Sequence, residues 1–238
     1  MPTVTAKEIL SELKPLGNEG YKRILLNHGI PEPLLGVKIE YLKKIQKRIK
    51  KDYQLALELY DTGVYEAMYL AGLIADDMRM TKEDMQRWIN KANCPSLHEY
   101  TVPWVASEGK HGRELALKWI ESKEEGTASS GWATLGNLVA LTDDSSLDMT
   151  ELRNLLDRVQ KTIHSQPDRV RHAMNGFIIA VGSYVKALTG EALQTAKKIG
   201  HVNVDMGGTA CRVPSAADQI NKVMKRGSVG KKRRTVKC

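Results

Sequence analysis

The sequence lacks a hydrophobic run long enough to cross a bilayer. Its longest nearly apolar stretches, residues 68–75 and 177–181, are far shorter than the ~20 apolar residues that a membrane-spanning helix needs. The N-terminus, MPTVTAKEILSELK, alternates apolar with charged residues and has no hydrophobic block followed by a small-residue cleavage site. We therefore expect a cytoplasmic protein without a membrane partner.

Cysteines and cofactor motifs are equally scarce. The three cysteines, Cys94, Cys211 and Cys238, form no CxxC pair, so the sequence suggests neither a disulfide framework nor a cysteine zinc site. No GxxxxGK(S/T), GxGxxG, HExxH or GxSxG motif is present, and the six histidines show no i, i+4 pair. These absences argue against nucleotide hydrolysis, dinucleotide chemistry and zinc proteolysis, and we expect no cofactor and no metal.

Acidic residues are missing from the C-terminal end of the chain. The 36 Lys and Arg outnumber the 28 Asp and Glu, giving a formal net charge of +8, yet residues 222–238 alone hold eight cations and no acid. Residues 227–238, GSVGKKRRTVKC, contain two glycines and no helical apolar period, which predicts a flexible basic tail. Such a tail binds polyanions in a salt-dependent manner; the alternative is a solubilising end without a partner. The candidate DNA contacts are Lys231, Lys232, Arg233 and Arg234.

A second basic region covers residues 38–51. Seven cations accompany a single acid, Glu40, while Leu42, Ile45 and Ile49 recur at helical spacing. This pattern predicts a helix that buries its apolar stripe and exposes its cations, which is either an ordinary solvated face or a second phosphate contact. The candidate DNA-binding residues are Lys38, Lys43, Lys44 and Lys47.

Most of the chain has the pattern of short amphipathic helices, about a dozen in all. The expected N-caps are Thr5, Asp52, Thr81, Asp148 and Ser215. Because the connections between helices are short, consecutive helices should lie antiparallel and stack. We expect a single all-α domain over residues 1–226, built as an α-solenoid with repeat units of about 40 residues, or alternatively an irregular helical bundle.

One segment breaks the helical pattern. In residues 201–214, HVNVDMGGTACRVP, apolar and polar residues alternate on both sides of Gly207 and Gly208. This predicts a β-hairpin over about residues 201–213, and it would pack on the flanking helices because an isolated hairpin is marginally stable. The hairpin is either a structural connector or a wedge whose tip residue, Met206, enters DNA, with Arg212 nearby as a further contact.

Two further segments carry candidate functional residues. Pro103 interrupts a helix and should bend it one turn after Glu99, which is then either a partly desolvated carboxylate or a plain solvent-facing side chain. Arg169 and Arg171 precede the apolar residues 177–181 on one predicted helix and could line a polar edge that contacts DNA.

Several stretches together are similar to one known family. They are LGVKIEYLKKIQKRI, EYTVP after a helix ending WINKAN, GWATLGNLVAL and AVGSYVKAL. These stretches resemble the HEAT-like-repeat alkylpurine DNA glycosylases, or AlkD-like proteins, over most of the helical body. The resemblance implies a right-handed α-solenoid of HEAT-like repeats that cradles duplex DNA on its concave face and excises N3- or N7-alkylated purines.

The residues of the family's lesion site are mostly replaced. Glu99 occupies the position of the family's carboxylate, but the tryptophan position falls on Pro95. The family's arginine falls at about Thr134 or Leu135, and its second aromatic residue falls near Ile179. The resemblance therefore favours a second, non-catalytic branch of the superfamily that binds branched DNA. The alternatives are an active glycosylase with Glu99 as its catalytic carboxylate, and a solenoid scaffold for other proteins. We expect DNA, duplex or branched, as the partner of a monomer.

Overall fold

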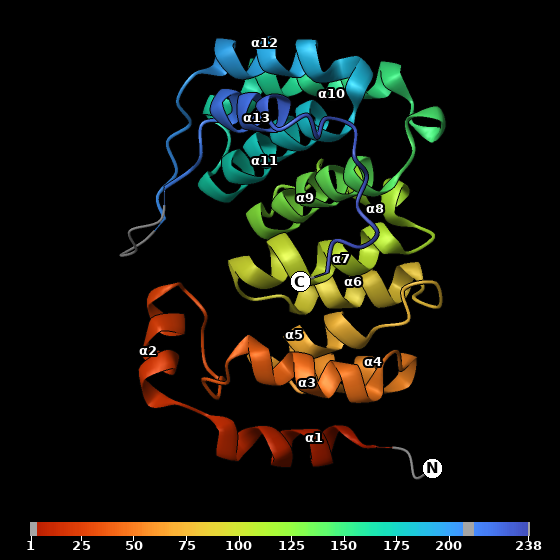
Figure 1. The fold of residues 1–238 in the computed structure, drawn as a ribbon. Helices are drawn as coiled ribbons and strands as arrows, with labels where there is room; N and C mark the ends of the chain where they lie inside the picture. The colour runs from red at the N-terminus through yellow and green to blue at the C-terminus, as the bar shows by residue number, and fades with distance from the viewer. Residues whose placement is uncertain (1–3, 207–211, 238) are drawn as a thin grey trace. The chain divides into compact units, whose positions relative to one another are not determined.

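The computed structural model describes residues 4–206 and 212–237, which form an all-helical protein (Figure 1). This confirms the all-α prediction, and the five expected N-caps each accept a backbone N–H from their own helix. A π-helix, Leu97–Thr101, and four short 3₁₀ turns lie between the α-helices. The α-helices are α1 (Ala6–Leu13), α2 (Glu19–Asn27), α3 (Ile39–Ile49), α4 (Tyr53–Asp61), α5 (Tyr65–Ile74), α6 (Lys82–Lys91), α7 (Val102–Glu108), α8 (Gly112–Trp119), α9 (Glu125–Leu141), α10 (Met149–Thr162), α11 (Asp168–Tyr184), α12 (Thr189–Ile199) and α13 (Ala216–Lys225).

The chain folds as two compact units. The first contains helices α1 to α7, and the described residues Met206 and Lys237 group with it. The second contains α8 to α13 together with the C-terminal segment as far as Val236. No single helix within the described ranges is long and apolar enough to cross a membrane; α11 and the following segment, Lys186–Ile199, pass that test only as a pair bent by 111°.

The first unit is built around α5, in which every residue from Tyr65 to Ile74 is buried. Its sequence, YEAMYLAGLI, is apolar on all sides, as expected for a helix that neighbours cover all around. Helices α3 and α4 and the π-helix pack against it. Helix α6 is joined to α4 by an aromatic stack, in which the rings of Tyr60 and Trp88 lie 4.1 Å apart and nearly parallel.

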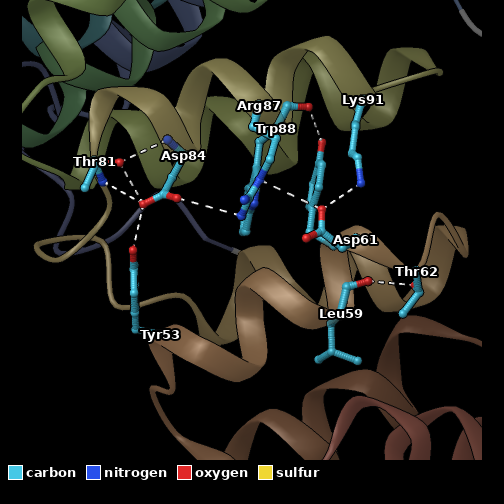
Figure 2. Close-up of polar contacts among 10 residues, drawn as sticks. Tyr53, Leu59, Asp61, Thr62, Thr81, Asp84, Arg87, Trp88 and Lys91 are labelled. Carbon is cyan, nitrogen blue, oxygen red and sulfur yellow. Dashed lines mark hydrogen bonds and ion pairs between the residues drawn. The ribbon is translucent and has the colours of Figure 1, made fainter.

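Polar contacts at the ends of α6 fix its position on α4 (Figure 2). At the N-terminal end, the Asp84 carboxylate completes a capping box with Thr81 and accepts a 2.8 Å hydrogen bond from the Tyr53 hydroxyl. At the other end, the Lys91 ammonium lies 2.7 Å from the Asp61 carboxylate. Polar contacts therefore hold both ends of α6 against α4, and the stacked rings pack its middle on the same helix.

The second unit centres on the packing of α9 against α11. The rings of Trp132 and Phe177 meet edge to face in its core, with centroids 5.3 Å apart. Helix α8 approaches α9 closely at Gly131, where a Cβ atom would lie only 2.7 Å from the backbone nitrogen of Ile120. A small residue is therefore required at this crossing.

Ion pairs link α8, α10 and α12 at a regular sequence spacing. Arg113 pairs with Glu151 and Arg153 with Glu191, each across 38 residues, and Arg158 pairs with Glu121 across 37. A recurring contact of this length agrees with the repeat of about 40 residues that the helix rhythm predicts. It also means that these cations already have carboxylate partners.

The predicted β-hairpin at residues 201–213 is wrong. Residues 201–206 and 212–214, which the structure describes, contain no strand, and the proposed tip residues Gly207 and Gly208 lie outside the described residues. The apolar alternation has a different cause. Val202 is buried in the core of the second unit, and Val204 and Val213 pack against that core. Packing on helices therefore explains the pattern without strand pairing.

Candidate nucleic-acid interface

Helix α3 presents lysines on one exposed face of the first unit. Leu42 and Ile45 are buried, as the stripe predicts; Lys38, Lys44 and Lys47 are exposed, and Lys43 is half-buried. Lys38 caps the N-terminus, and the Lys44 ammonium lies 4.8 Å above the ring of Tyr41. The described structure gives no carboxylate partner to the group of Lys38, Lys43, Lys44 and Lys47, which we call the α3 lysines.

The next cations along this region have a different environment. Arg48 forms a bidentate pair with Glu12 of α1, with its closest N–O distance at 2.6 Å. Lys51 lies 3.0 Å from Asp77, a carboxylate that is 1% exposed. Both side chains join elements of the first unit, so the basic region divides into structural cations and the α3 lysines.

A buried carboxylate positions the N-terminus of α3. Glu66 of α5 is completely buried and accepts hydrogen bonds from the backbone N–H groups of Leu35, Gly36 and Val37 at 2.9, 2.7 and 3.1 Å. Gly36 has φ of +77° and lies where a Cβ atom would contact the Asn18 carbonyl at 2.5 Å. The loop that leads into α3 is therefore held by a charged acceptor in the protein interior.

The C-terminal basic residues lie along the ends of α9 and α11. The Gly230 N–H donates to the Ser183 carbonyl at 2.9 Å, and the Arg233 N–H donates to the Ala140 carbonyl at 2.8 Å. The Lys232 ammonium donates to the Val139 carbonyl and pairs with the Asp144 carboxylate. Lys231, Arg233 and Arg234 are exposed, and none of their side chains has a carboxylate partner among the residues with described positions.

Helix α13 adds a basic patch that begins just before this segment. Lys222, Lys225 and Arg226 are exposed, and Met224 among them is 45% exposed although it is apolar. The sequence analysis grouped these cations with the basic tail and did not identify Met224 as exposed. Ile220 and Val223 follow a helical apolar spacing, which gives no reason to place the neighbouring Met224 on the solvent side.

The remaining candidates are scattered. Arg171 is paired with Asp168 on its own helix, and the Arg169 N–H donates to Glu125 at 2.7 Å, so the start of α11 is already covered by acids. Met206 is half-buried and groups with the first unit, and Arg212 is exposed in the second.

Glu99 lies in the π-helix and is only 8% exposed, so the solvent-facing interpretation is wrong. The π turn comes directly before Pro103, whose missing N–H disturbs the α-helical ladder, and π turns occur often at functional sites. The π-helix packs closely on α5, since a Cβ atom at Gly72 would lie 2.5 Å from the Thr101 methyl group. Burial lowers the pKa of the neighbouring His98.

Three aromatic rings contact one another at the π-helix, which contains Glu99 and Tyr100. Trp104 lies edge-on to Tyr69 at 5.4 Å and tilted to Tyr100 at 6.1 Å between ring centroids. Tyr69 and Trp104 are buried, whereas Tyr100 is 47% exposed. Aromatic faces attract cations, and Tyr100 directly follows Glu99 in the chain.

Pro95, at the family's tryptophan position, belongs to the first unit, whereas the three further positions suggested for a lesion site belong to the second. Thr134 is completely buried and its hydroxyl donates to the Ser130 carbonyl, and Leu135 is 3% exposed. Ile179 packs half-buried against the same core. The preceding Trp132 is buried against Phe177, so its ring is not available to stack on a base.

The sequence over residues 9–213 matches the family described as DNA alkylation repair enzymes. The chain belongs to this family. It is 34% identical over 229 residues to an uncharacterized protein of Listeria innocua and 33% identical over 229 residues to one of Listeria monocytogenes; each match covers 94% of this chain and 99% of the relative.

A solved structure shares the fold over nearly the whole chain. It is 36% identical, with a TM-score of 0.91, and the match covers 99% of this chain and 100% of the other. That protein is described as one of a new family related to the HEAT-like repeat DNA glycosylases, with affinity for branched DNA structures. The HEAT-like helical fold that the resemblance implied is therefore confirmed, and so is the relationship to DNA alkylation repair.

Proposed function

We propose that this protein binds DNA, prefers branched to linear duplexes, and does not excise bases. The proposal is carried by one observation: some basic side chains pair with carboxylates and others do not. Arginines on α8 and α10 are paired with carboxylates, whereas the α3 lysines and the exposed cations of α13 and the C-terminal segment have none among the described residues. When such unpaired surface cations neutralise phosphates, the counterions condensed on the DNA are released, and this release favours binding.

The preference for branched DNA is supported by the solved relative, whose fold this chain shares at 36% identity. The absence of excision is supported by the positions of the second unit just described, where buried Thr134 and Leu135 occupy a place expected for an arginine. A binding site without that arginine, and with Pro95 in place of the family's tryptophan, retains phosphate contacts but lacks groups that stabilise a departing base.

Binding of a four-way junction and a linear duplex, measured over a range of salt concentrations, tests the proposal. We expect the junction to bind more tightly and the affinity for both to fall steeply with salt. Equal affinities would refute the preference for branches, and affinity that does not change with salt would refute phosphate binding.

A matched pair of variants tests the α3 lysines. Lys44→Ala with Lys47→Ala should reduce the slope of log affinity against log salt by about 1.8, since each lost phosphate contact contributes about 0.9. Lys118→Ala with Lys123→Ala removes the same charge from exposed positions of the second unit and should leave the slope unchanged. Equal effects of the two pairs would contradict a specific role for α3.

A second candidate function is excision of alkylated purines, which the burial of Glu99, directly before Tyr100 in the chain, favours. In that case the carboxylate would stabilise positive charge on the sugar as the base leaves. Release of 7-methylguanine or 3-methyladenine by excess protein, abolished in Glu99→Gln, would establish this activity. No release under those conditions would reject it.

A further inference from the structure

Lys232 differs from its basic neighbours in its surroundings. Its side chain is 15% exposed, and its ammonium lies 2.9 Å from the Val139 carbonyl and 2.7 Å from the Asp144 carboxylate. Its hydrogen bonds are therefore directed into the second unit. By contrast, Lys231 and Arg233 on either side of it are exposed.

The Asp144 carboxylate connects three segments of the second unit. One of its carboxylate oxygens faces Lys232, and the other accepts a 3.2 Å hydrogen bond from the backbone N–H of Lys186, directly after α11. Asp144 itself follows α9 in a 3₁₀ turn. The carboxylate thus ties the C-terminal segment to the ends of the two central helices.

Backbone hydrogen bonds on both sides of Lys232 complete the attachment. The N–H groups of Gly230 and Arg233 donate to Ser183 and Ala140, which are among the last residues of α11 and α9. Carbonyls at helix ends lack partners within the helix and carry partial negative charge. A positively charged segment is therefore well suited to cover them.

We propose that Lys232 is a positioning residue, which anchors the C-terminal basic segment through Asp144 so that Lys231, Arg233 and Arg234 are held ready to contact DNA phosphates. The proposal rests on the DNA binding proposed above and replaces the flexible tail expected from composition. Holding the segment in place lowers the conformational entropy lost on binding, so the same cations bind more tightly.

The decisive test is a substitution that removes a negative charge from the protein and is nevertheless expected to weaken DNA binding. Asp144→Asn raises the net charge by one, which by charge alone favours DNA. Because it releases Lys232, we expect affinity for the four-way junction to fall about three- to tenfold, the size of effect that loss of preorganisation of a few side chains produces. Asp143→Asn is the matched control, since Asp143 is exposed, adjacent and has no ion pair within the described structure. It should bind at least as tightly as the unmodified protein.

The salt dependence separates positioning from direct contact. If Lys232 only positions the segment, Lys232→Met weakens binding at every salt concentration and leaves the slope of log affinity against log salt unchanged. If Lys232 itself contacts phosphate, that slope falls by about 0.9 and the proposal is wrong. Lys232→Arg keeps the charge and should restore most of the affinity.

Hydrogen exchange of the free protein reports on the anchor without DNA. In Asp144→Asn the amides of Gly230 and Arg233 should exchange faster than in Asp143→Asn, while the amides within α9 and α11 stay protected and show that the unit remains folded. Unchanged exchange, or junction affinity equal to that of Asp143→Asn, would overturn the anchoring. If the unmodified protein binds no DNA, the proposed function fails, while the exchange result still decides whether Lys232 holds the segment.

Discussion

The buried carboxylate of Glu66 should be one of the most important side chains for the stability of the first unit. In Glu66→Ala the backbone N–H groups of Leu35, Gly36 and Val37 lose their acceptor. Gly36 and Val37 are buried and Leu35 is partly buried. An unsatisfied buried donor costs ~1–3 kcal/mol, so two fully buried donors and one partly buried donor give a loss of about 3–5 kcal/mol.

That loss is a large fraction of the ~5–15 kcal/mol by which a typical domain is stable. The assay is chemical denaturation followed by circular dichroism, with the free energy of unfolding compared between variants of equal denaturant dependence. Glu58→Ala, at an exposed position of α4, is the control and should change stability by less than about 0.5 kcal/mol.

Because the loop that Glu66 holds leads directly into α3, Glu66→Ala should also weaken DNA binding at temperatures where the protein remains folded. A loss of stability below about 1 kcal/mol would refute the view that the three N–H groups depend on this carboxylate.

Two further outcomes are expected. Gly131→Ala should destabilise the second unit by about 1–3 kcal/mol, because the added methyl group clashes with α8. Gly176→Ala is the control: its position is helical, exposed and has free space around it, so alanine should stabilise the protein by up to ~1 kcal/mol. Similar shifts of the thermal unfolding temperature in both variants would contradict the close approach of α8 to α9 at Gly131. Burial lowers the pKa of His98, so the unfolded chain binds more protons below about pH 6.5 and stability should fall as the pH drops through that range. Denaturation between about pH 5 and 7 should show a weaker pH dependence in His98→Gln than in the exposed control His28→Gln, and equal slopes would refute it.

The helices, their N-terminal ends and their buried faces could be predicted from short stretches of sequence. Side chains such as Thr5 and Ser215 act within one turn of their own helix, so their sequence neighbours reveal the cap. The stripe of Leu42 and Ile45 likewise fixes which face of α3 is buried, and hence that Lys44 and Lys47 are exposed. These features depend on residues three or four positions apart, which is the range that a pattern can show.

Other features depend on contacts that a local pattern cannot show. Val202 and Val204 alternate as in a strand, but they pack with the core of the second unit, whose buried residues extend from Ala116 to Ile220. The partner of Lys232 is Asp144, 88 positions earlier, so composition could suggest only a flexible tail. Glu99 lies in a π-helix that packs closely on α5 where Thr101 meets Gly72, and a local pattern contains no information about that contact.

Titration of a fluorescent four-way junction and of a linear duplex of the same length, from low to moderate salt, addresses DNA recognition most directly. We predict tighter binding of the junction, with a log–log salt slope that decreases when Lys44 and Lys47 are replaced and stays the same when Lys118 and Lys123 are replaced. Failure of both DNAs to bind even at low salt would contradict the assignment of these unpaired cations to a DNA-binding surface.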